Sequence, residues 1–184
     1  MTQRQHKFIT IEGLKGSGKT SVSRALAEQL GALWYTTPPE PFRAIRDVVE
    51  QKATPHARYL YYLAGIVQAS AEIETILSHQ PVVCDKFLAT MVAYSRAAGI
   101  EVSIPPSSLV IEPDFSFLLV VPDDVRRQRI ASRGVITAAE DAFFRMEVEQ
   151  HVMDGYHNLK VHVLANCESG LAATVTHIRA AVES

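Results

Sequence analysis

With 184 residues, 47% of them hydrophobic, the chain is long enough to bury the core of one α/β domain and leaves little room for a second, so a single domain over residues 1–184 is expected. The net charge of −2 and the pI near 6.4 argue against a general nucleic-acid-binding protein, which usually carries a basic surplus on one face. The polar start from Met1 to Lys7 argues against a signal peptide, and no apolar run has the length of a membrane span. A soluble, cytoplasmic protein is expected.

Short apolar runs alternate with longer helical patterns, a rhythm typical of repeated βαβ units. The proline-rich stretches Thr37–Pro41 and Ile104–Pro113 are expected to be loops, because proline lacks an N–H donor and disfavours helix in the residue before it. The predicted fold is α/β, a three-layer sandwich with helices on both faces of a five-stranded parallel sheet and ligands at the carboxyl ends of the strands. The strands are predicted near Lys7–Glu12, Ala32–Thr36, Pro81–Asp85, Phe115–Val121 and Lys160–Leu164.

The stretch Gly13-Leu14-Lys15-Gly16-Ser17-Gly18-Lys19-Thr20 follows the first predicted strand and opens a helical pattern, the order that a phosphate-binding P-loop requires. Its glycines let backbone N–H groups converge on phosphate oxygens, and the helix beginning near Lys19 adds the positive end of its dipole. Lys19 is expected to reach the β and γ phosphates, and Thr20 to offer its hydroxyl to Mg²⁺, which prefers oxygen ligands. The residues of this segment expected to bind ATP are Gly13, Lys15, Gly16, Ser17, Gly18, Lys19, Thr20 and Ser21.

Two further segments bear on the same site. A strongly apolar helix from Tyr59 to Leu77 is expected to be mostly core, with at most one of its tyrosines facing a substrate. The next predicted strand ends at Asp85 beside the expected P-loop, where a carboxylate can hold Mg²⁺ or orient an acceptor phosphate; capping of the following helix is the alternative. Glu12, directly before the P-loop, is expected to support this region from behind.

Several other groups have a simpler structural interpretation. Asp123, after Val121-Pro122, is predicted to cap a helix running through Arg133, so Asp123 and Asp124 are not taken as a catalytic pair. The histidines show no zinc-binding spacing, and no metal other than nucleotide-bound Mg²⁺ is expected. Cys84 and Cys167 lie in apolar segments and are expected to be buried thiols.

A P-loop alone leaves kinases, GTPases, ATPases and regulatory modules open. The chain has no Asn-Lys-x-Asp motif and no glycine after Asp85, which argues against a GTPase. Three segments together resemble thymidylate kinases: Phe8–Gly13 entering the P-loop, Val83–Phe87 with Tyr94 behind it, and Glu112–Asp114 leading into a strand. The resemblance covers nearly the whole chain.

The rest of the resemblance lies toward the C-terminus. The helix Arg126–Arg133 is similar to the family's approach to its lid, placed at about residues 133–147, and Arg145-Met146-Glu147 resembles the lid's Arg-x-Glu motif. Ala165 and Asn166 resemble the family's adenine-contacting loop. The resemblance implies transfer of the ATP γ-phosphoryl group to the phosphate of a nucleoside monophosphate, with Mg²⁺ as cofactor.

Such a transfer spreads charge over the moving phosphoryl oxygens, so most of the catalysis comes from well-placed cations and N–H groups and from a lid that excludes water. Arg145 is the first choice for the lid cation and Arg133 the second, although both could instead pair with nearby acidic residues on a solvated helix face. Metal binding is assigned to Thr20 and Asp85. The catalytic residues implied are Lys19, Asp85, Arg145 and Arg133.

The acceptor site departs from the family pattern. Tyr62 matches a base-stacking phenylalanine, but Ile66 stands where the family's arginine reads the thymine carbonyl. Losing a polar contact weakens discrimination, because sites built to pair a polar edge reject analogues more strongly than apolar ones do. Lys86 replaces an arginine and keeps the charge without the two-pronged phosphate contact. The acceptor-binding residues implied are Glu40, Arg43, Arg46, Tyr62, Ile66, Lys86 and Tyr94.

Two loop positions also differ from the family. Lys15 stands where members usually carry an acid that contacts the sugar hydroxyl, and it could favour an anion near the sugar or point to solvent. Pro39 replaces the arginine of the family's Arg-Glu-Pro loop, so Arg43 or Arg46 is expected to compensate.

Three hypotheses for function follow. The first is a thymidylate-kinase-like enzyme whose acceptor is dTMP, another nucleotide or a phosphorylated metabolite. The second is a kinase of a nucleoside or other small-molecule hydroxyl, with Asp85 as base, and the third is a nucleotide-binding module with little turnover. By analogy a homodimer is expected, to which the apolar helix Pro55–His79 contributes, with no nucleic-acid or membrane partner.

Overall fold

The computed structural model describes residues 5–103, 105–132, 134, 146–157, 159–165 and 170–184. Its centre is a parallel sheet in the order β2-β3-β1-β4-β5, and each predicted strand is present with its ends within two residues of the prediction. The strands are β1 (Phe8–Gly13), β2 (Leu33–Thr36), β3 (Val82–Asp85), β4 (Phe115–Val120) and β5 (His162–Ala165). The predicted α/β fold class and the three layers are confirmed.

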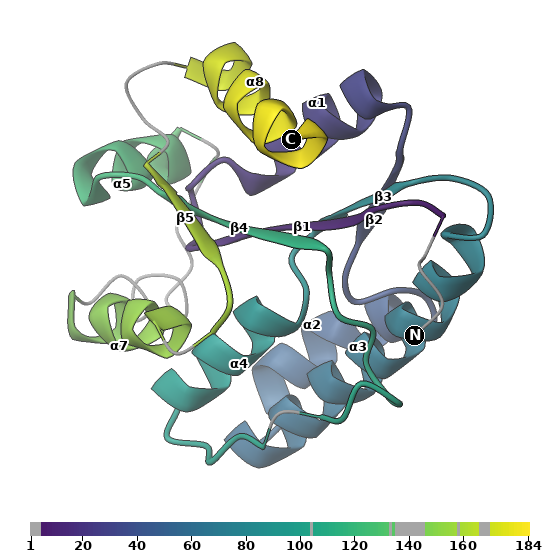
Figure 1. Cartoon of the computed structure of the whole chain (residues 1–184). Helices are drawn as coiled ribbons and strands as arrows, with labels where there is room; N and C mark the ends of the chain where they lie inside the picture. Colours follow the sequence, from purple (N-terminus) through teal and green to yellow (C-terminus); the bar gives the residue numbers. More distant parts are fainter. Residues whose placement is uncertain (1–4, 104, 133, 135–145, 158, 166–169) are drawn as a thin grey trace.

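Helices cover both faces of this sheet (Figure 1). One layer contains α1 (Lys19–Leu30) and α8 (Gly170–Glu183), and the other contains α2 (Phe42–Lys52), α3 (Pro55–Ile76), α4 (Leu88–Ala97) and α7 (Met146–His157). The short helix α5 (Asp123–Ala131) follows β4. The long apolar helix α3 was predicted to reach His79 and ends three residues earlier.

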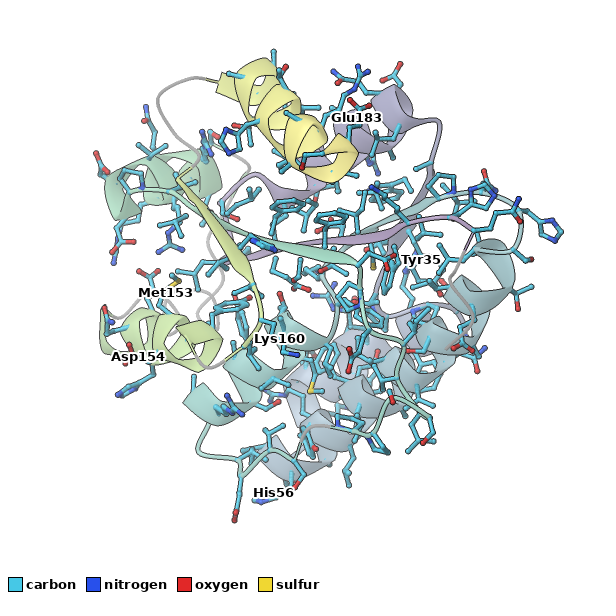
Figure 2. The ribbon with its side chains drawn as sticks, in the orientation of Figure 1. Tyr35, His56, Met153, Asp154, Lys160 and Glu183 are labelled. Atoms are coloured by element: carbon cyan, nitrogen blue, oxygen red, sulfur yellow. The ribbon has the colours of Figure 1, made fainter. Side chains whose placement is uncertain are left out.

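Alternation along the strands divides the apolar residues between the two faces of the sheet, and side chains fill the space between the sheet and each helical layer (Figure 2). Ile9 and Ile11 of β1 pack with α1 and α8, whereas Phe8 packs with α3 and α4. Because both faces are covered, the central strands β1 and β3 are buried along their whole length. The sheet therefore gives a rigid support for the groups at its carboxyl edge.

Two helix ends show how the local sequence defines these elements. Helix α3 begins as expected from its sequence, with Pro55 in the first turn and the Thr54 hydroxyl accepting the Ala57 N–H at 3.3 Å. Helix α5 corrects a prediction: Pro122, in an extended conformation, precedes the helix, and Asp123 is already its first residue. The Asp123 carboxylate binds Arg126 instead of capping the helix.

Three other expectations concern single features. The stretch Thr37–Pro41 forms a loop, as predicted. Cys84 is a buried free thiol, while Cys167 lies outside the described residues. Among the helices that the structure describes, none is both long and apolar enough to cross a bilayer.

Candidate functional site

The P-loop joins β1 to α1 at the carboxyl edge of the sheet, and its glycines are required by geometry. Gly13, Gly16 and Gly18 all have positive φ, at 142°, 84° and 92°. A Cβ atom added to Gly13 would lie 2.7 Å from the Leu119 carbonyl oxygen, and one added to Gly16 would lie 2.8 Å from Cδ1 of Ile130. The loop is therefore packed from outside by β4 and α5, and its shape depends on residues without side chains.

Lys19 lies at the start of α1, with its ammonium inside the fold. Its Nζ donates to the Leu14 carbonyl of the same loop at 2.6 Å. Burial lowers the pKa of Lys19 to about 7, with the nearby Asp85 carboxylate acting in the opposite direction. A cation that is this poorly solvated gains strongly from an anionic ligand, as a phosphate site requires.

Thr20 and Asp85 form a second pair beside the loop. The Thr20 hydroxyl donates to Oδ2 of Asp85 at 2.5 Å, and the Asp85 side chain, at the end of β3, is 3% exposed. The other carboxylate oxygen, Oδ1, is buried and has no hydrogen-bond partner among the described residues. A hydroxyl beside an incompletely bonded carboxylate is a set of hard oxygen donors, which suits Mg²⁺. These residues fit the predicted metal.

Glu12 supports the site from beneath, as expected. Its buried carboxylate accepts the backbone N–H of Phe87 at 3.3 Å and of Thr90 at 3.1 Å, and also the Thr90 hydroxyl. These N–H groups belong to the first turn of α4, so a residue of β1 caps that helix from a neighbouring strand. Burial raises the pKa of Glu12, and the hydrogen bonds oppose that rise.

A cavity of about 660 Å³ opens beside the P-loop and extends between α2, α3 and α4. It brings together most of the residues predicted for ATP and for the acceptor. Those on its wall are Gly13, Lys15, Gly16, Gly18, Lys19, Thr20, Ser21, Arg46, Tyr62, Ile66, Lys86 and Tyr94. Phosphate-binding and acceptor-binding candidates therefore share one continuous space.

The far end of the cavity has an apolar wall beside a polar cluster. Ile66, Met91 and Phe87 are all less than 8% exposed and line the apolar wall. The polar cluster consists of Tyr62, Glu50 and Arg46. The Tyr62 hydroxyl donates to Glu50 of α2, and Arg46 hydrogen-bonds to Tyr62. Burial and the hydrogen bond to Glu50 raise the pKa of Tyr62, so the phenol remains neutral. The ring of Tyr62 is thus held at the cavity wall by α2.

Arg58 of α3 strengthens the same connection. Its guanidinium donates to the carbonyls of Glu50 at 3.1 Å and Ala53 at 3.4 Å, and lies 3.7 Å from the Glu50 carboxylate. Neither Glu50 nor Arg58 was predicted as a site residue, because their contacts join two separate helices and leave no local sequence pattern.

Lys86 combines a cation with an unusual backbone. Its φ is 68°, the only positive value among the described residues other than glycine. Its carbonyl accepts the Thr37 hydroxyl at 2.9 Å and the Cys84 thiol at 3.1 Å, which hold this conformation. Burial lowers the pKa of the Lys86 ammonium, with Asp85 opposing. Strained backbone of this kind is commonly found at functional sites.

Two predicted acceptor residues lie away from the cavity wall. The Arg43 guanidinium donates to the carbonyls of Thr36 and Pro38 at 3.2–3.3 Å, and it lies 4.0 Å from the Glu40 carboxylate. Arg43 and Glu40 therefore brace the proline-rich loop. Of the two arginines expected to compensate for Pro39, Arg46 is the one that reaches the cavity.

Arg126 is an important residue to which the sequence analysis assigned no role of its own. Its side chain is 2% exposed, and Nη1 donates to the Lys15 carbonyl of the P-loop at 3.0 Å. Nη2 lies 2.6 Å from Oε2 of Glu149 on α7. One signal was present: Ile130 lies four positions later, so the helical period places Arg126 on the same buried face.

Several predicted residues cannot be placed. Arg133, Arg145 and Asn166 lie outside the described residues, and Ala165 is placed only as the last residue of β5. Of the acidic residues expected to compete for the lid arginines, Glu140 and Asp141 also lie outside the described residues, whereas Glu149 binds Arg126.

The chain is similar in sequence to thymidylate kinases. The family model of thymidylate kinase matches residues 11–167. A probable thymidylate kinase of Methanocaldococcus jannaschii is 29% identical over 158 residues, covering 83% of this chain and 80% of that protein. A thymidylate kinase of Geobacter sp. (strain M21) is 33% identical over 172 residues, covering 81% of this chain and 76% of that protein.

Solved structures give the same fold. Thymidylate kinase from Candida albicans superposes with a TM-score of 0.75 at 16% identity, covering 99% of this chain and 93% of that one. The enzyme from Ehrlichia chaffeensis gives 0.73 at 22% identity, covering 96% and 98%. The family match spans the P-loop, Asp85 and the whole acceptor wall. The chain therefore belongs to the thymidylate kinase family, whose members are ATP-dependent nucleoside monophosphate kinases.

Proposed function

We propose that this protein transfers the γ-phosphoryl group of ATP to the phosphate of dTMP or a closely related nucleotide, with Mg²⁺ as cofactor. The observation that carries the proposal is the shared cavity: the P-loop, Lys19 and Thr20 form one part of its wall, and the Tyr62 ring with Ile66 forms another. A donor and an acceptor held in one continuous space meet the positional requirement of direct phosphoryl transfer.

Different residues of the chain are proposed to bind ATP, the metal and the acceptor. The P-loop N–H groups and Lys19 bind the phosphates of ATP, while Thr20 and Asp85 hold the metal. When bound, Mg²⁺ supplies positive charge beside the phosphate oxygens. Arg46 and Lys86 bind the acceptor phosphate, and Tyr62 stacks on the acceptor ring. Arg145, with Arg133 as the alternative, is proposed as the lid cation on the strength of the family resemblance.

The acceptor is expected to be chosen by shape more than by polar contacts. Ile66 and Met91 present only apolar atoms and a thioether to the cavity, so they offer no charged donor to a base carbonyl. A missing polar contact of this kind typically lowers discrimination among similar bases. We therefore expect dTMP to be accepted together with other pyrimidine nucleotides, such as dUMP.

The kinase of a hydroxyl group is less well supported by the geometry. A base for that reaction needs to reach the acceptor, but the Asp85 side chain is 3% exposed and hydrogen-bonds to Thr20 beside the P-loop. The nucleotide-binding module, in turn, gives no reason for an acceptor pocket beside the P-loop.

We also propose that the protein acts as a homodimer. Ile45 and Val48 of α2 and Leu60 of α3 are large apolar side chains that are 53–60% exposed. Such side chains on neighbouring helices favour burial against a second copy. Sedimentation equilibrium of the wild type and of Leu60→Glu tests this, and a monomeric wild type would contradict it.

The test of function is ATP turnover with a panel of acceptors: dTMP, dUMP, UMP, CMP, AMP, GMP and thymidine. Lys19→Ala serves as the blank. Turnover with dTMP and dUMP but not with thymidine supports the proposal. Turnover with thymidine alone would replace it with the hydroxyl kinase, and ATP binding without turnover of any acceptor would indicate a binding module.

A further inference from the structure

We propose that Arg126, held by Glu149 and acting together with Tyr94, is a positioning residue that fixes the P-loop peptides around Lys15 in the orientation that binds nucleotide. The inference rests on the proposed function in one respect, namely that ATP is the ligand of the P-loop. It concerns residues outside the phosphate-binding motif itself.

Arg126 is held by ion pairs with two acidic residues. Its guanidinium lies between two carboxylates, 3.0 Å from Oδ1 of Asp123 on its own helix and 2.6 Å from Oε2 of Glu149 on α7. Arg126 and Glu149 are 2% and 4% exposed. The guanidinium is planar, so the ion pair made by Nη2 also fixes the direction of Nη1, which donates to the Lys15 carbonyl at 3.0 Å.

The contact between Arg126 and the Lys15 carbonyl orients the peptide that joins Lys15 to Gly16. In a planar trans peptide the carbonyl and the following N–H point in opposite directions. Holding the Lys15 carbonyl toward Arg126 therefore directs the Gly16 N–H away from Arg126. Gly16 has φ 84°, and Arg126's own carbonyl oxygen would lie 3.0 Å from a Cβ at that position. Side chain and backbone of Arg126 thus define this peptide together.

Tyr94 fixes the preceding peptide from α4. The backbone N–H of Lys15 hydrogen-bonds to the Tyr94 hydroxyl, which is deeply buried. Burial raises the pKa of Tyr94 to about 12, while this N–H and Arg126 act in the opposite direction. The backbone N–H and carbonyl of Lys15 are therefore both bound by side chains from other elements. This arrangement fixes the P-loop in its binding conformation before nucleotide binds.

A buried ion pair is a weak source of stability, because desolvation of the two charges offsets their attraction and apolar residues of similar size often serve as well. The fold alone gives little reason for charges at 126 and 149. The Nη1 contact with the P-loop gives one, since an apolar side chain could pack in this place but could not hold the Lys15 carbonyl.

The ion pair between Arg126 and Glu149 also joins two helices that are separated in the chain. Helix α5 ends at Ala131 and α7 begins at Met146, so Arg126 and Glu149 join the two helices on either side of the expected lid segment.

The experiment separates positioning from packing by removing both charges together. Arg126→Met alone leaves Glu149 buried without its partner and is expected to lower the Tm. The double variant Arg126→Met/Glu149→Met removes that penalty and is expected to regain a Tm near that of the wild type. ATP affinity, measured by isothermal titration calorimetry with Mg²⁺ and without acceptor, is expected to remain about tenfold weaker in the double variant.

The matched control is Arg129→Met, which removes a partly exposed arginine from the same helix. Arg129 is not among the residues that line the cavity, so this variant should bind ATP like the wild type. A double variant with both wild-type Tm and wild-type ATP affinity would overturn the inference. If the double variant does not fold, Tyr94→Phe decides: it removes only the hydroxyl that holds the Lys15 N–H, and is expected to weaken ATP binding several-fold with little change in Tm. Unchanged affinity in that folded variant would overturn the inference as well.

These readouts stay separate from the proposed function. If the wild type binds ATP but phosphorylates no nucleotide, the kinase proposal fails while the affinity comparison still tests the role of Arg126.

Discussion

Thr20 and Asp85 are separated by 65 positions in the chain, yet the hydroxyl of one donates to the carboxylate of the other at 2.5 Å. The contact joins the first turn of α1 to the end of β3, the strand beside β1 in the sheet. It follows from parallel topology, which brings the carboxyl end of every strand to the same edge.

Replacement of Thr20 tests this pair as a metal site. Thr20→Ser keeps the hydroxyl and should keep most of the activity, whereas Thr20→Val keeps the shape and should weaken Mg²⁺ activation by about 10- to 100-fold, because one hard oxygen ligand is lost. Turnover is measured against Mg²⁺ concentration at saturating ATP. Equal Mg²⁺ dependence in the two variants would remove this hydroxyl from the metal site.

The buried Lys19 ammonium should make the free energy of unfolding depend on pH. Its pKa is lowered from 10.5 to about 7 in the fold, first by burial. Between these values the unfolded chain binds more protons, so the free energy of unfolding rises with pH through this window; below it both states are charged and the penalty is complete. Relative to Lys19→Met, the wild type should gain at most about 1.4 kcal/mol per pH unit between about pH 7 and 9. Urea unfolding at several pH values measures this, and a constant difference between the two proteins would contradict it.

Gly16 should tolerate no side chain. Gly16→Ala places a Cβ 3.0 Å from the Arg126 carbonyl oxygen and 2.8 Å from Cδ1 of Ile130 at φ 84°, and is expected to weaken ATP binding strongly because the backbone contact and the positive φ both disfavour the native loop shape. Gly31→Ala is the matched control: it also has positive φ, but nothing lies within 4 Å of its Cβ. It should cost about 1 kcal/mol of stability and leave ATP affinity unchanged. Wild-type ATP affinity in Gly16→Ala would show that the loop adapts.

Tyr62 is expected to act through its ring. Tyr62→Phe removes the bond to Glu50 and should change the acceptor KM less than about threefold, while Tyr62→Ala should raise it at least tenfold, since aromatic stacking contributes about 1–3 kcal/mol per base. Steady-state kinetics with dTMP at saturating ATP gives both values, and the KM for ATP serves as the internal control. If Tyr62→Phe were as defective as Tyr62→Ala, the contact with α2 would matter more than the ring.

The predictable part of this protein is the part encoded locally. The strands β1 and β3 are rich in apolar residues, and the P-loop is a contiguous motif whose spacing follows from its chemistry, so both were predicted at nearly their observed positions. The cap at Asp123 was wrong because the competing partner, Arg126, lies one turn later and is itself bound by Glu149 from another helix. The roles of Arg133 and Arg145 stay predictions.

The acceptor wall shows the same limit. The sequence indicated Tyr62 and Ile66 through resemblance, but the contacts of Glu50 with Tyr62 and Arg58 arise only when α2 packs beside α3. Arg43 was expected to face a substrate, and instead it binds the carbonyls of its own loop. A charged residue near a site has several possible partners, and three-dimensional packing decides among them.

At Lys86, the residue type that best suits the backbone differs from the type that best suits the proposed function. Its left-handed backbone favours glycine or asparagine for folding, whereas the proposed contact with the acceptor phosphate favours a long cation. Lys86→Gly and Lys86→Asn should therefore raise thermal stability and lower turnover, whereas Lys86→Arg should keep more of the turnover. The native lysine gives a less stable turn than glycine would, and it places a charge where the acceptor phosphate is proposed to bind.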